Sequence, residues 1–213
     1  MSLHPTTPQF KDNAHRAMGD AQLQRALGNM RTGFPERRAA AAARMPEFEA
    51  LRDSARDIKN HTLAHLDLYL EAYAAKVEAA GGHVHFCRDA AEANRAIVDI
   101  CKQLGARTVT KGKSMISEEM GLNDALDAAG VKPIETDLGE YIIQLRGETP
   151  SHIIAPAIHL NKEQVEGDFR RVHQHLAKER DLSQPVQLLT EARGVLREKF
   201  LAADVGITGA NFL

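Results

Sequence analysis

The chain has 213 residues, of which 43% are hydrophobic and 26% are charged, and these proportions exclude a disordered chain. Its 27 Lys and Arg against 29 Asp and Glu leave a net charge of -2, so overall charge gives no reason to bind nucleic acid. Apolar runs stay shorter than the roughly 18 residues of a membrane-spanning helix, and residues 1–15 lack a secretion signal. We therefore expect a cytoplasmic protein with no membrane insertion and no nucleic-acid partner.

Cysteine is scarce in this sequence, since Cys87 and Cys101 are the only two. Two thiols cannot build a disulfide scaffold, and a cubane iron–sulfur cluster needs about four thiolates. The histidine spacings signal no third metal ligand. We therefore expect no metal and no iron–sulfur cofactor in this chain.

The N-terminal part is predicted to be a helical arm over residues 1–45, because it is rich in Ala, Arg and Gln. A helix is expected to start near Pro35, since proline suits the first turn of a helix. Over residues 46–80, apolar residues recur at steps typical of one helical face. Gly81 and Gly82 are expected to end that helix.

The remaining sequence alternates between short β-branched segments and helical patterns. Strands are predicted over residues 83–87, 107–110, 131–135, 152–155 and 204–208, and helices over residues 89–104, 114–129, 138–145, 161–178 and 185–203. This alternation is typical of parallel strands, which need crossover connections. The predicted fold class is α/β: a mostly parallel sheet flanked by helices, with a helical N-terminal extension and an α/β domain over residues 46–213.

One predicted strand delivers Lys111, Gly112, Lys113 and Ser114 to the start of a helix. Ligands usually bind at this carboxyl edge of a parallel sheet, where backbone N–H groups and lysine charge favour an anion. The four residues are therefore predicted to bind a small carboxylate or phosphate. The alternative is that Ser114 caps the helix and the lysines are solvated. A P-loop is excluded, because Arg107 stands where its first glycine would be.

Four carboxylates and one histidine are the candidate catalytic residues. Glu135 ends the next predicted strand, and Asp137 and Glu140 follow it closely. Two carboxylates that converge can share a proton or hold a cation. Glu118 lies in the first turn of a predicted helix, and His152 begins a predicted strand. The alternatives are a turn capped by Asp137, a helix-dipole partner at Glu118 and a structural role for His152.

Five segments, in this order, resemble the lactate utilization protein B family: GGHVHF, KGKSMISEE, ETDLGEYIIQL, PSHIIAPAIHLNKEQV and REKFLAADVGITGANF. The resemblance implies a LUD domain, with a fold similar to the NagB/RpiA/CoA-transferase type. It also implies an iron–sulfur protein that transfers electrons in a complex converting L-lactate to pyruvate. Family members carry their cluster-binding cysteines in a C-terminal region that this chain lacks. We therefore expect an incomplete domain that is inactive in isolation, with other subunits of that complex as partners.

Two other classes of function are open. The implied fold is shared with CoA-transferases and sugar-phosphate isomerases, although function lies in sites rather than folds. A non-catalytic assembly or regulatory module is the second alternative, in which the helical arm docks a partner. A homo-oligomer is also open. The strand predicted over residues 204–208 would leave an unpaired sheet edge, which favours pairing with a partner chain that supplies the rest of the domain.

Overall fold

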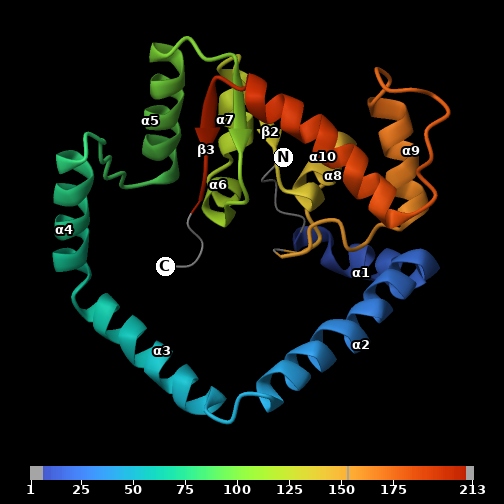
Figure 1. Cartoon of the computed structure of the whole chain (residues 1–213), viewed down its shortest axis with the longest axis horizontal. Helices are drawn as coiled ribbons and strands as arrows, with labels where there is room; N and C mark the ends of the chain where they lie inside the picture. Colours follow the sequence, from blue (N-terminus) through green and yellow to red (C-terminus); the bar gives the residue numbers. More distant parts are fainter. Residues whose placement is uncertain (1–6, 153, 210–213) are drawn as a thin grey trace. The chain divides into compact units, whose positions relative to one another are not determined.

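The structure is a computed structural model that describes residues 7–152 and 154–209 (Figure 1). The chain divides into two compact units, one formed by Met1–Leu27 with Arg88–Leu213 and the other by Gly28–Cys87. The division predicted from the sequence, with an arm over residues 1–45 and a domain over residues 46–213, stays a prediction.

The described residues form mostly helices, with one small sheet. The N-terminal helices are η1 (Thr7–Gln9), α1 (Phe10–Gly19), α2 (Ala21–Ala43), α3 (Phe48–Ala64) and α4 (Leu66–Ala79). They are followed by α5 (Ala90–Gln103), β1 (Thr108–Lys111), α6 (Met115–Glu119), α7 (Leu122–Ala128), β2 (Lys132–Glu135), α8 (Leu138–Arg146), α9 (Lys162–Val172), α10 (Pro185–Ala202) and β3 (Val205–Ile207).

The sheet has the order β2-β1-β3, and both strand pairs are parallel. The Asp204 side chain fixes the start of β3, because its Oδ2 accepts hydrogen bonds from the backbone N–H groups of Arg107 and Thr108, each at 2.9 Å. In the register of the sheet, Lys111 lies opposite Glu135. Two charged residues therefore meet at the carboxyl edge, where ligands bind in parallel α/β folds.

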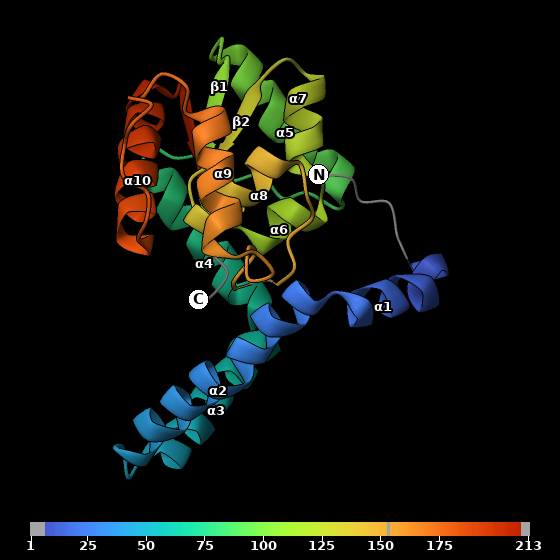
Figure 2. The ribbon, with the colours of Figure 1, turned by 90° about the vertical axis from the view of Figure 1, so that its right-hand side faces the viewer.

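Helices cover both faces of the sheet (Figure 2). On one face, α5 and α7 bury apolar side chains against β1 around Val109, Leu122 and Leu126. On the other side, α8, α9 and α10 pack together around Phe169 and Ala192. Apolar burial on both sides fits parallel strands, which are buried on both faces. The predicted α/β class is confirmed at this level: a parallel sheet flanked by helices, with helices at the N-terminus.

Two of the five predicted strands are wrong. Residues 83–87 form no strand, and His152, Ile154 and Ala155 lie outside any strand, while Ile153 is outside the described residues. The physical reason is that a strand needs a hydrogen-bonded neighbour, and these segments find none among the described residues. The three remaining predictions correspond to β1, β2 and β3.

Four predicted helices differ from the structure. Pro35 does not start a helix but lies inside α2. The helix predicted over residues 46–80 is divided at His65 into α3 and α4. The helix predicted over residues 114–129 is divided into α6 and α7 at Gly121, whose φ of 68° is a left-handed conformation that favours glycine. The helix predicted over residues 161–178 ends at Val172.

The unit Gly28–Cys87 contains the last part of α2 together with α3 and α4. Its apolar residues are largely exposed, including Ile58 and Leu63. Within the described residues, no helix combines the length and apolar character needed to cross a membrane.

Candidate functional site

Lys111 lies at the centre of a group of charged residues at the carboxyl edge of the sheet. Lys111 is the last residue of β1, and its side chain is 0% exposed. Its Nζ lies 2.7 Å from Glu118 Oε1 and 2.8 Å from Glu135 Oε1, and it donates to Ser117 Oγ at 3.1 Å. The three protons of the ammonium therefore have three acceptors.

The ion pairs of Lys111 determine its pKa. Burial alone would lower the pKa of this ammonium, but the hydrogen bonds to Glu118 and Glu135 outweigh burial and raise it above its usual value. Lys111 is therefore charged at neutral pH. A buried charge of this kind is tolerated because it is paired and hydrogen-bonded.

Lys113 lies two residues further along, in the loop between β1 and α6. Its Nζ lies 3.0 Å from Glu140 Oε1 and 3.5 Å from Asp137 Oδ1, and its side chain is 27% exposed. Asp137 also caps α8, because its Oδ1 accepts from the N–H groups of Gly139 and Glu140. Lys113 therefore holds two carboxylates at the start of α8 and, unlike Lys111, is accessible to solvent.

Gly112 and Ser114 have identifiable structural contacts. The Gly112 N–H donates to the Ile207 carbonyl at 2.8 Å, which joins the loop to β3. Ser114 is the N-cap of α6, and its Oγ accepts from the Ser117 N–H at 3.2 Å. The capping alternative for Ser114 is therefore observed, and the predicted anion contact stays a prediction.

We call Lys111, Lys113, Glu118, Glu135, Asp137 and Glu140 the lysine–carboxylate cluster. The structure thus brings together all the lysine and carboxylate side chains that the sequence predicts for the site, from the end of β1 to the start of α8. His152 is not part of it: its Nδ1 accepts from the N–H groups of Ile154 and Ala155 at 3.1 and 3.2 Å within an exposed turn.

A cavity of about 200 Å³ lies against this cluster. Glu118, Glu135 and Glu140 are among its lining residues. The Oε2 atoms of Glu135 and Glu140 are buried and have no hydrogen-bond partner among the described residues. Burial is the main cause that raises the pKa of Glu140, opposed by the hydrogen bond from Lys113. The pKa of the Glu140 carboxyl group is therefore held above its usual value.

Sequence reasoning missed the polar side chains that hold Glu135 in place. Asn123 Nδ2 donates to Glu135 Oε1 at 2.7 Å. The Gln144 side chain accepts from the Glu135 N–H at 3.0 Å and donates to the Pro133 carbonyl at 3.0 Å. Gln144 therefore satisfies the free edge of β2 as a neighbouring strand would. No short motif announces these contacts, because they join residues from separate elements.

Sequence reasoning also missed two sets of hydrogen-bonded side chains outside the lysine–carboxylate cluster. His159 Nε2 lies 2.9 Å from Glu148 Oε2, and the other ring nitrogen contacts the Ser151 hydroxyl. Arg146 holds Glu148 at 2.7 Å and lowers its pKa. Further along, Tyr141, His173, Glu191 and Arg180 form a buried chain of hydrogen bonds.

Among the described residues, no three His, Cys, Asp or Glu side chains form a metal-binding group. Of the two cysteines, Cys101 is buried and Cys87 is exposed. Burial raises the pKa of the Cys101 thiol, which disfavours the thiolate that a metal or cluster would need.

The lysine–carboxylate cluster lies at the carboxyl edge of a parallel sheet, which is where ligands bind in α/β folds. Comparison with known proteins makes this more specific. The sequence profile of the LUD domain matches residues 70–213, and the chain belongs to this family.

The whole chain is similar to longer curated proteins. It is 42% identical to lactate utilization protein B of Macrococcus caseolyticus and 39% identical to lactate utilization protein B of Bacillus subtilis. It is 38% identical to an uncharacterized electron transport protein, YkgF, of Escherichia coli. Each comparison covers 100% of this chain but 44% of the relative, so the chain spans less than half the length of these proteins. No solved structure gives a significant match.

Proposed function

We propose that this chain is the LUD-domain part of an iron–sulfur protein that transfers electrons during the oxidation of L-lactate to pyruvate. The observation that carries the proposal is the similarity to lactate utilization protein B, which extends over 100% of this chain at 42% identity. The match to an electron transport protein supports the redox part. The same proposal includes a cytoplasmic location and other subunits of a lactate-oxidising complex as partners.

The residues of this chain do not fit an iron–sulfur cluster. Cys87 and Cys101 are its only cysteines, and a cubane cluster takes about four thiolates. The two also belong to different compact units. In this proposal the clusters are bound by residues outside the present sequence, and no step of electron transfer is assigned to these side chains.

The role that we propose for the present residues is to hold a small carboxylate at the loop of Lys111, Gly112, Lys113 and Ser114. Lys113 is the contact residue, because its side chain is 27% exposed whereas Lys111 is fully buried. The carboxylates around Lys113 restrict how an anionic ligand can bind there. With all groups ionised, four carboxylates outnumber two lysines, so an anion must displace a carboxylate from Lys113.

Glu140 is the carboxylate that we propose to yield. Its raised pKa makes the neutral form accessible, and protonation would release Lys113 and remove a charge that repels the ligand. Glu118 and Glu135 hold Lys111, so their role is to position the strand end. The finer fold assignment, a sheet of the NagB/RpiA/CoA-transferase type, is part of the same proposal.

A chimera tests this function. The matching region of the Bacillus subtilis lactate utilization protein B, which is 39% identical over 215 residues, is replaced by this chain. The chimera is expressed in a strain without the native gene, and growth on L-lactate is measured. Restored growth is expected. In the chimera, Lys113→Met should reduce growth, whereas Lys102→Met, at an exposed lysine on α5, should not. A chimera that accumulates without supporting growth would contradict the proposal.

A further inference from the structure

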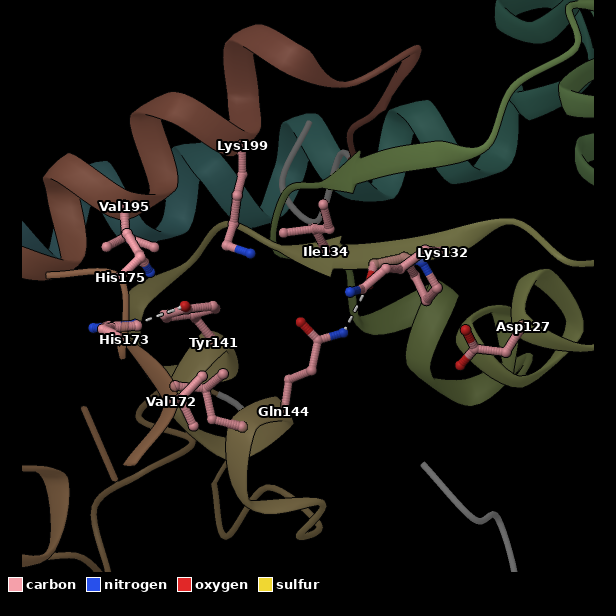
Figure 3. Close-up of a pocket in the computed structure, with 12 residues that line it drawn as sticks. Asp127, Lys132, Ile134, Tyr141, Gln144, Val172, His173, His175, Val195 and Lys199 are labelled. Atoms are coloured by element: carbon pink, nitrogen blue, oxygen red, sulfur yellow. Dashed lines mark hydrogen bonds between the residues drawn. The ribbon is translucent and has the colours of Figure 1, made fainter. Parts of the chain in front are cut away.

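A larger cavity lies where β2 faces α8, α9 and α10, and it shares Asp127 and Gln144 with the cavity at the lysine–carboxylate cluster. Its volume is about 360 Å³. Much of its wall is apolar, formed by Ile134, Leu145, Val172 and Val195. Figure 3 shows the Lys199 side chain reaching from α10 toward Ile134 and Tyr141. An apolar cavity with a few polar groups is the usual form of a small-molecule site.

Two lysines on this cavity, Lys132 and Lys199, make no ion pair and no side-chain hydrogen bond with any described residue. They differ in this from Lys111 and Lys162, which are ion-paired with carboxylates. Lys199 is half-buried near the end of α10, whereas Lys132 is exposed at the start of β2. An anion at this place would supply the missing charge.

Two lining residues, Tyr141 and His173, belong to a buried chain of hydrogen bonds, and we call this side of the cavity its floor. Tyr141 Oη lies 2.9 Å from His173 Nε2, and His173 Nδ1 lies 2.8 Å from Glu191 Oε1. Arg180 Nε donates to Glu191 at 2.6 Å. Burial opposes ionisation of Glu191, but the hydrogen bonds from Arg180 and His173 outweigh it and lower its pKa, so Glu191 is ionised.

These charges leave the floor without a negative group of its own. The Glu191 carboxylate is neutralised by Arg180, and burial raises the pKa of Tyr141 to about 12, so the phenol is neutral. His173 contacts Glu191 through Nδ1 and the Tyr141 hydroxyl through Nε2. One carboxylate, Asp127, remains on the lining and opposes a second negative charge on a ligand.

We infer that this cavity binds an organic monocarboxylate with an apolar body, with the carboxylate at Lys199 and Lys132 and the body against the apolar wall. The inference goes beyond the proposed function, because it concerns a different cavity and a different ligand. Lactate has a single methyl group, which is too small to contact the whole apolar wall. A carboxylate with several methylene groups would contact more of it, and each buried methylene strengthens binding.

Isothermal titration calorimetry on the whole chain at constant ionic strength tests the inference. Acetate, butyrate and hexanoate are titrated, and affinity is expected to increase about fourfold for each methylene. Lys199→Met should weaken hexanoate binding about tenfold or more, because the charged contact is lost while the length of the side chain is kept. Lys132→Met should weaken it as well.

The controls separate charge and apolar contacts from nonspecific binding. Lys102→Met removes an exposed lysine on α5 and should leave hexanoate binding unchanged. Hexylammonium and inorganic phosphate should bind at least tenfold more weakly than hexanoate. The inference is overturned if no carboxylate binds, if hexanoate binds no tighter than acetate, or if Lys199→Met and Lys102→Met behave alike. None of these results depends on activity in lactate oxidation.

Discussion

Replacing Lys111 by methionine tests how the carboxyl edge of the sheet is held together. Methionine keeps an unbranched side chain of similar length, so the main change is the loss of the ammonium group. Glu135, with its side chain 3% exposed, would then lose the lysine Nζ at 2.8 Å. Removing one partner of a buried ion pair costs about 3–5 kcal/mol, because the other charge stays buried and uncompensated.

This loss is large beside the total stability of about 5–15 kcal/mol that is usual for a domain. The assay is urea denaturation followed by circular dichroism, together with hydrogen exchange of the β1 amides, which reports on the sheet itself. Lys113→Met is the matched control. Because Lys113 is 27% exposed, its ion pairs are screened and its loss should cost about 1 kcal/mol or less.

A second variant separates the loss of charge balance from loss of packing. Lys111→Met combined with Glu135→Gln removes both charges of the pair, so it should be more stable than Lys111→Met alone. The pKa of Lys111 is raised in the folded chain, so its contribution is complete below the usual lysine pKa of about 10.4 and is lost as pH rises through the raised value. A cost below about 1 kcal/mol for Lys111→Met at neutral pH would refute the reasoning.

The other predictions concern separate contacts. Tyr141→Phe should destabilise the chain by about 1–3 kcal/mol in urea denaturation, because the buried His173 Nε2 loses its partner; an unchanged midpoint would contradict this. In carbon NMR titrations, Glu140 should titrate above the usual value of about 4.3, and its stabilising contribution should be lost as pH rises through that raised pKa. Lys113→Met should raise it further, and an unchanged value would count against the hydrogen bond. Asp204→Asn should speed hydrogen exchange at the start of β1. The contribution of the Asp204 carboxylate to stability should be lost only as pH falls through its lowered pKa.

The sheet could be predicted where local sequence and pairing agree. Thr108–Lys111 is rich in β-branched residues, follows a helix and finds two parallel neighbours. Residues 83–87 have a similar local pattern, yet no strand in the described part of the chain pairs with them. A sequence pattern reports the propensity of a segment, whereas a strand also requires a partner whose position depends on the whole fold.

The location of the candidate site could be predicted from the sequence, but the burial and the individual contacts of its side chains could not. Parallel strands end at the same edge, so residues that follow β1 and β2 were expected to meet there, and Lys111 lies opposite Glu135. The burial of Lys111 could not be foreseen, because it depends on α6 supplying Glu118 and Ser117 as acceptors. Glu191 and His173 are 18 residues apart, so no local motif signals their contact.

The most direct test of the proposed function is a rate measured in cell extracts. L-lactate-dependent reduction of an artificial electron acceptor is compared in strains carrying the native Bacillus subtilis lactate utilization protein B, the chimera with this chain, and an empty vector. The account predicts a rate with the chimera close to that of the native protein, and none above the vector when L-lactate is omitted. A chimera that is present at native levels, but gives no rate above the vector, would contradict it.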